Sequence, residues 1–159
     1  MKIKVLVVFY SRTGTTKRVA EALTASLNCD SEEIIDAENR RGFFGFLKSG
    51  YEAAVKKCPP IKEVEKDPSL YDLVVIGTPV WDGTMASPVR TYLMKYKDRF
   101  KSVAFFCTMS GSRSNVFAEM ESVCEKKPQA QCMLQRAIVE QNKYADKLEQ
   151  FVNTLKMMK

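Results

Sequence analysis

Hydroxyl side chains gather in one short segment near the N-terminus, between an apolar run and a stretch with helical spacing. Ser11, Thr13, Thr15 and Thr16 surround Gly14 in the sequence YSRTGTT. At the start of a helix the backbone N–H groups are unpaired and the helix dipole is positive, so an anion is favoured there. The patterns G-x-x-x-x-G-K-[ST] and G-x-G-x-x-G are absent from the sequence. The segment therefore predicts a site for one terminal monophosphate, with simple capping of a helix as the alternative.

This segment resembles the phosphate loop of the flavodoxins, which is commonly written T/S-x-T-G-x-T. Ser11, Thr13, Gly14 and Thr16 match its positions, and Thr15 stands where many relatives carry asparagine. In that family the loop binds the ribityl phosphate of flavin mononucleotide (FMN). The resemblance implies that the cofactor is FMN and that its phosphate is bound by Ser11, Arg12, Thr13, Gly14, Thr15 and Thr16.

Two more turn-rich segments follow apolar runs that are typical of strands. One contains the chain's only tryptophan, Trp81, which could cover one face of a flat aromatic ring; the alternative is that it packs in the core. The second is rich in small residues and could instead be a plain connection. Both segments resemble the flavin-ring loops of small flavodoxin-like oxidoreductases. That resemblance implies ring contacts from Thr78, Pro79, Val80, Trp81, Asp82, Gly83, Thr108, Met109, Ser110, Gly111 and Ser112.

A different chemistry is conceivable at the end of the fourth apolar run. Cys107 and Arg113 fit the C-x5-R pattern of cysteine-dependent phosphatases, and Ser114 follows. Amide groups and an arginine there would bind a phosphate and lower the pKa of the thiol. However, Cys107 continues an apolar strand pattern and could be a small buried residue. Neither Asp82 nor Asp98 is favoured by its spacing as the general acid.

Composition restricts the other functions. The chain has no histidine, which excludes Ser-His-Asp and Cys-His nucleophiles and the common histidine-ligated metal sites. Its five cysteines include no C-x-x-C pair, as expected of reduced thiols in a cytoplasmic protein without a structural metal. The net charge of +6 favours anionic ligands or partners, but no long basic block indicates nucleic-acid binding. No apolar run is long enough for a membrane span.

Alternating apolar runs predict a doubly wound α/β fold. We expect one domain over residues 1–159, with five parallel strands joined by helices in right-handed crossovers. The resemblance to flavodoxins implies the strand order 2-1-3-4-5, with the ligand beyond the carboxyl ends of strands 1, 3 and 4. The predicted strands are Val5–Phe9, Glu32–Asp36, Leu73–Gly77, Val103–Cys107 and Ala130–Leu134, and the later helices are predicted from about Pro88, over Asn115–Lys127 and over Val139–Met157.

The segment from Arg40 to Lys57, RRGFFGFLKSGYEAAVKK, mixes basic and aromatic residues. Its apolar residues form a rough helical stripe, which favours a crossover helix that packs on the sheet. The basic and aromatic mixture could instead belong to a helix that lies on a membrane surface or binds a partner, and residues Phe43 to Tyr51 could also cover the flavin. Three glycines, at positions 42, 45 and 50, predict that its first part is a loop.

Together these observations predict an FMN-binding redox protein in which no side chain acts as acid or base. The reaction would be electron transfer to a partner protein, or NAD(P)H-linked reduction of a small acceptor such as a quinone. The alternatives are the Cys107 and Arg113 phosphatase and a non-catalytic flavin-binding interaction module. The sequence does not specify the electron donor, the acceptor or the oligomeric state.

Overall fold

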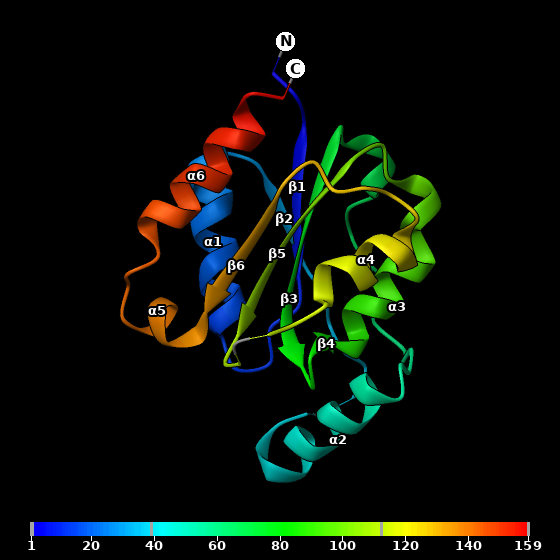
Figure 1. Cartoon of the computed structure of the whole chain (residues 1–159). Coiled ribbons are helices and arrows are strands. Elements are labelled where there is room, and N and C mark those ends of the chain that lie inside the picture. The colour runs from blue at the N-terminus through cyan, green and yellow to red at the C-terminus, as the bar shows by residue number, and fades with distance from the viewer. Residues whose placement is uncertain (1, 39, 112, 159) are drawn as a thin grey trace.

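The computed structural model describes residues 2–38, 40–111 and 113–158. A twisted parallel sheet lies between two layers of helices (Figure 1). The strand order is β2-β1-β3-β5-β6, and the short strand β4 pairs antiparallel with β3. The predicted α/β class and the predicted order of the five parallel strands are therefore confirmed. The strands are β1 (Val5–Phe9), β2 (Asp30–Glu33), β3 (Leu73–Trp81), β4 (Thr84–Met85), β5 (Val103–Met109) and β6 (Gln131–Gln135).

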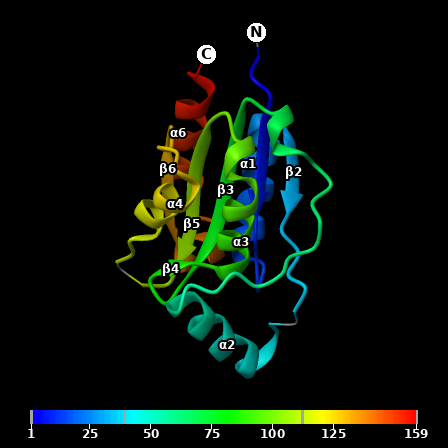
Figure 2. The ribbon, with the colours of Figure 1, turned by 90° about the vertical axis from the view of Figure 1, so that its right-hand side faces the viewer.

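Each face of the sheet is covered by its own helices. Helices α1, α5 and α6 lie on one face and α3 and α4 on the other, whereas α2 extends beyond the end of the sheet (Figures 1 and 2). The apolar side chains accordingly form two clusters, one on each face. The helices are α1 (Thr15–Leu27), α2 (Gly42–Ala54), α3 (Ser87–Tyr96), α4 (Val116–Cys124), α5 (Arg136–Glu140) and α6 (Ala145–Lys156), with 3-10 turns at Pro68–Leu70 and Lys97–Arg99.

The two central strands are longer than predicted at the end where they position the site. Pro79 pairs with Thr108, and Thr108 with Leu134, so hydrogen bonding between the strands continues past the apolar runs. Residues 78–81 therefore belong to β3 and residues 108 and 109 to β5. A two-residue turn then joins β3 to β4, and both of its residues, Asp82 and Gly83, have positive φ. This Asp-Gly hairpin signal was available in the sequence.

Three further predicted elements are wrong in their bounds. The second strand begins two residues and ends three residues earlier than expected, and α4 ends at Cys124 because Glu125 adopts the left-handed conformation. The expected long C-terminal helix is two helices, α5 and α6, separated by a turn in which Asn142 has a φ of 55°. Among the described residues no helix is long and apolar enough to cross a membrane.

The segment from Arg40 to Lys57 differs most from expectation. The helix begins at Gly42, so its first part is not a loop. Its apolar side chains do not pack on the sheet either: Phe43, Phe44 and Tyr51 are 69%, 83% and 60% exposed. The residues that α2 buries are small or polar, namely Gly45, Ser49, Glu52 and Ala53.

Candidate functional site

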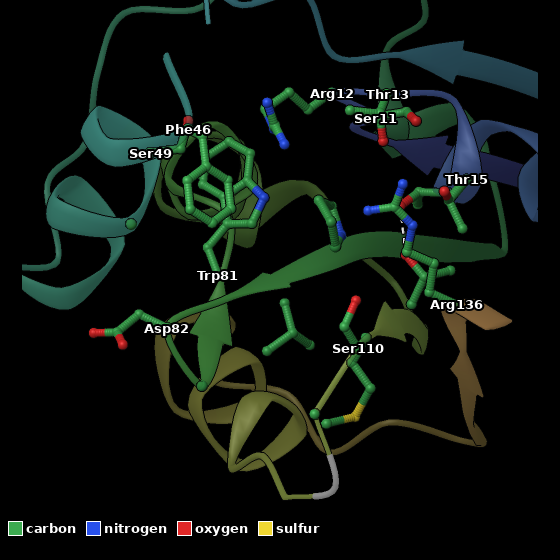
Figure 3. A pocket seen from close by; sticks show the side chains of 18 of the residues that line it. Ser11, Arg12, Thr13, Thr15, Phe46, Ser49, Trp81, Asp82, Ser110 and Arg136 are labelled. Carbon is green, nitrogen blue, oxygen red and sulfur yellow. Dashed lines mark hydrogen bonds between the residues drawn. The ribbon is translucent and has the colours of Figure 1, made fainter. Parts of the chain in front are cut away.

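A cavity of about 620 Å³ opens at the carboxyl end of the sheet (Figure 3). Three segments that are far apart in the sequence form it: the turn between β1 and α1, the end of β3 with its hairpin, and the end of β5. One side of α2 completes the wall. The described lining residues are Ser11, Arg12, Thr13, Thr15, Thr16, Phe46, Leu47, Ser49, Gly50, Tyr51, Ala54, Pro79, Val80, Trp81, Asp82, Gly83, Thr108, Met109, Ser110, Gly111, Arg113 and Arg136.

The start of α1 forms the polar end of this cavity. Gly14 is the N-cap residue, and its φ of 104° is a conformation that glycine tolerates best. The hydroxyl of Ser11 accepts a hydrogen bond from the Gly14 N–H at 3.1 Å. Glycine provides no capping side chain, so the first-turn N–H groups are left for a ligand. The buried hydroxyls of Thr16 and Thr108 are 2.7 Å apart and tie this turn to β5.

Trp81 forms part of the opposite wall, and Figure 3 shows it across the cavity from the Ser11 and Thr15 side chains. Tyr10 contacts the Trp81 ring edge-on at 5.4 Å between centroids, and the Arg40 guanidinium lies 5.6 Å from the same ring. Burial, and then the charge of Asp36, raise the pKa of Tyr10 to about 12, so this phenol stays neutral. The half-buried indole is thus held by neighbours while part of it faces the cavity.

The cavity is electropositive. Arg12, Arg113 and Arg136 line it, and Asp82 is the one carboxylate among the described lining residues. The Arg12 guanidinium lies 5.4 Å from the Phe46 ring, which ties the α1 turn to α2 across the opening. Because clefts with one sign of charge concentrate the opposite ion, this lining favours an anionic ligand.

The structure brings together almost all of the residues that the sequence predicted for the site. Three are exceptions. Gly14 does not line the cavity but shapes the turn, and Ser112 lies outside the described residues. Thr78 is fully buried: its hydroxyl accepts the N–H of Ala86 at 3.0 Å and donates to the carbonyl of Pro79 at 2.8 Å. Both functions of the Thr78 hydroxyl thus serve the backbone, and its expected ring contact stays a prediction. That the lining residues contact FMN stays a prediction.

Sequence reasoning missed two groups of lining residues. Arg136 directly follows the carboxyl end of β6, so the rule that ligands bind beyond such ends could have found it. Arg113 was considered only for a phosphatase. The α2 residues of the wall, from Phe46 to Ala54, were not predicted as site residues because the helix was favoured on the sheet, with a cover over the flavin as one alternative for Phe43 to Tyr51.

The structure does not support the phosphatase alternative. Cys107 is fully buried in the apolar cluster beneath α3 and α4 and is not a lining residue. Burial, and then the neighbouring Cys132, raise the pKa of its thiol to about 12. A phosphatase nucleophile needs an accessible thiolate, so Cys107 is the small buried residue of the alternative interpretation.

The sequence matches no protein-family model, and no curated protein resembles it significantly. Several solved structures, in contrast, are similar to this chain. A flavoprotein from Lactobacillus acidophilus in complex with FMN is 25% identical, with a TM-score of 0.69 over 90% of this chain and 99% of that one. A flavodoxin, WrbA-like protein from Agrobacterium tumefaciens is 14% identical, with a TM-score of 0.64 over 99% of both chains. Flavodoxin 2 from Bacillus cereus is 16% identical, with a TM-score of 0.56 over 95% and 96%. The chain therefore has the flavodoxin-like fold.

Proposed function

We propose that this chain, a flavodoxin-like protein, binds FMN in the cavity at the carboxyl end of its sheet and is an FMN-dependent redox protein. The observation that carries this proposal is the meeting of three distant segments around one cavity. An uncapped helix start lies at one side of it and Trp81 at the other. The L. acidophilus flavoprotein with this fold is a complex with FMN, which supports the assignment.

The lining residues fit the parts of the cofactor. The first-turn N–H groups of α1 and the hydroxyls of Ser11, Thr13 and Thr15 would bind the phosphate. Figure 3 shows Arg136 on the same side of the cavity as Thr15, where it would add a positive charge. Trp81 would cover one face of the ring, and the backbone around Gly83 and Gly111 would approach its polar edge. When bound, FMN supplies electron-transfer chemistry that no side chain here provides.

The charge of the chain bears on its role. Flavodoxins that act as electron carriers are typically acidic, whereas this chain has a net charge of +6 and three cavity arginines. Positive charge near a reduced flavin stabilises it and makes its reduction potential less negative. We therefore favour an NAD(P)H-linked reductase of a quinone-like acceptor over a carrier that transfers electrons to a partner protein at low potential.

Reconstitution followed by turnover tests this proposal. The purified chain, mixed with FMN and desalted, should keep one equivalent of flavin and be yellow. It should then oxidise NADH or NADPH in the presence of a soluble quinone. A chain that remains colourless would contradict FMN binding. A yellow chain without turnover would instead indicate a carrier, or a flavin-binding module if no partner protein oxidises it either.

A further inference from the structure

Helix α2 presents its apolar side outward and its polar side inward, the reverse of an ordinary surface helix. Figures 1 and 2 show it projecting from the end of the sheet. Its exposed apolar residues, which we name the α2 face, are 48% to 83% exposed. They are Phe43, Phe44, Phe46, Leu47, Tyr51 and Val55.

Buried polar contacts hold the helix in this orientation. Arg40, 3% exposed, forms ion pairs with Asp36 and with Glu52 of α2. The hydroxyl of Ser87 at the start of α3 donates to Glu52 at 3.3 Å. Gly45 packs so closely on the Arg40 backbone that a Cβ at this position would overlap it. These contacts fix the polar side of α2 against the body. The fold therefore leaves the α2 face exposed, with Phe46, Leu47 and Tyr51 at the cavity and Phe43 and Phe44 away from it.

The α2 face is wide. At 3.6 residues per turn, its members from Phe46 to Val55 spread over about half of the helix circumference. A helix that binds in a protein groove needs only a stripe of residues spaced i, i+3, i+4 and i+7. Here the consecutive residues Phe43 and Phe44 point in different directions, and both are exposed. Such a spread suits a fluid apolar medium that contacts the helix from several sides.

Charges around the α2 face are basic. Residues 41–57 contain Arg41, Lys48, Lys56 and Lys57, and their one acid, Glu52, is 4% exposed and turned inward. Acidic groups from neighbouring segments reach two of the lysines: Glu38 pairs with Lys48 at 2.6 Å and Glu119 with Lys56 at 3.3 Å. The two lysines are themselves 48% and 62% exposed, and ion pairs of such side chains are weak, so the lysines can exchange these partners for other anions.

We propose that the α2 face docks on an anionic lipid bilayer, with its aromatic side chains in the interface and its lysines on the headgroups. Aromatic and basic residues together on one exposed helix are what such binding requires. Docking against a second copy would bring two basic segments together, which their repulsion disfavours. Phe46, Leu47 and Tyr51 also line the cavity, so docking would place its opening beside the lipid. This last consequence rests on the proposed function and would favour a lipophilic acceptor.

Vesicle sedimentation tests the docking without any flavin. The wild-type chain should sediment with phosphatidylglycerol vesicles and much less with phosphatidylcholine vesicles, and added salt should weaken the binding. Phe44→Ser changes the most exposed member of the α2 face, which does not line the cavity, and should lower the partition coefficient about tenfold. Lys57→Glu should lower it by a similar factor.

Two control variants lie at the other end of the molecule, at the end of α6 (Figure 1). Met157→Ser removes an apolar side chain that is 80% exposed, and Lys156→Glu changes the net charge as Lys57→Glu does. Both should bind vesicles like the wild type. Equal binding to both lipids, or equal losses in the controls, would overturn the proposal. A wild-type chain that is monomeric and binds no vesicle would also overturn it and would point to a protein partner. A wild-type chain that is a dimer, and that Phe44→Ser makes monomeric, would overturn it as well.

Discussion

Helices α1 and α2, which both border the cavity, are built in opposite ways. Helix α1 packs Val19, Ala20, Leu23 and Leu27 on the sheet and directs its polar start to the cavity. Helix α2 buries small and polar residues and leaves its phenylalanines exposed. The comparison shows that apolar spacing identifies which residues share a face of a helix. Whether that face is buried depends on whether other parts of the chain provide an apolar surface for it to pack on.

Truncating one leucine in each helix should give the largest difference. Leu23→Ala removes a fully buried side chain from α1 and should lower the free energy of unfolding by about 3 kcal/mol, through lost burial and a new cavity. Leu47→Ala removes a side chain of α2 that is 50% exposed and should cost less than about 1 kcal/mol. Urea denaturation measures both. Equal losses would mean that the α2 face is buried in the protein in solution.

The second test concerns the buried polar contacts of α2. Glu52→Gln leaves the Arg40 guanidinium buried with one partner fewer and should cost about 2 kcal/mol, with faster amide exchange in α2. Glu38→Gln is the matched control, because Glu38 also pairs with Arg40 and Lys48 but is only partly buried. Because its side chain is 37% exposed, against 5% for Glu52, this substitution should change neither measurement. If the two variants behave alike, the orientation of α2 has another cause.

The difference between α1 and α2 also separates what could be predicted from the sequence from what could not. The strands and the buried stripe of α1 could be predicted because both faces of the sheet demand continuous apolar runs. The order of the strands followed only from the resemblance to flavodoxins. The orientation of α2 could not, since Arg40 finds Asp36 and Glu52 only after folding. The break between α5 and α6 at Asn142 has no glycine or proline to mark it. At the site, the loops after β1, β3 and β5 carried recognisable motifs. The α2 residues reach the cavity wall only because tertiary contacts place the helix there.

A third test uses the polar start of α1, which has no equivalent on α2. Thr15→Val removes a cavity hydroxyl with little change in shape and should weaken FMN binding by about fivefold, as expected for one hydrogen bond to a charged group. Riboflavin, which lacks the phosphate, should bind equally to both proteins. An equal loss for riboflavin would place the phosphate away from α1. Equilibrium dialysis gives both constants.

The last test compares the reactivity of two thiols, one beyond the end of α2 and one in the core. Alkylation of the exposed thiol is expected to disturb the protein least. Cys58 is exposed, and Cys107 is buried with its pKa raised to about 12 by burial and the neighbouring Cys132. At pH 8 iodoacetamide should modify Cys58 rapidly and leave Cys107 unmodified until the chain is unfolded, as peptide mass spectrometry would show. Rapid modification of Cys107 in the folded chain would reopen the phosphatase interpretation.

The most direct measurement is a titration of the cofactor-free chain with FMN and with riboflavin, followed by the fluorescence of Trp81, the chain's only tryptophan. If the cavity binds the ring beside Trp81 and the phosphate at α1, FMN should quench the fluorescence with a sharp endpoint at one equivalent. Riboflavin should bind at least about tenfold more weakly, because it lacks the charged group that the helix start favours. Unchanged fluorescence, or equal affinity for the two flavins, would contradict the account.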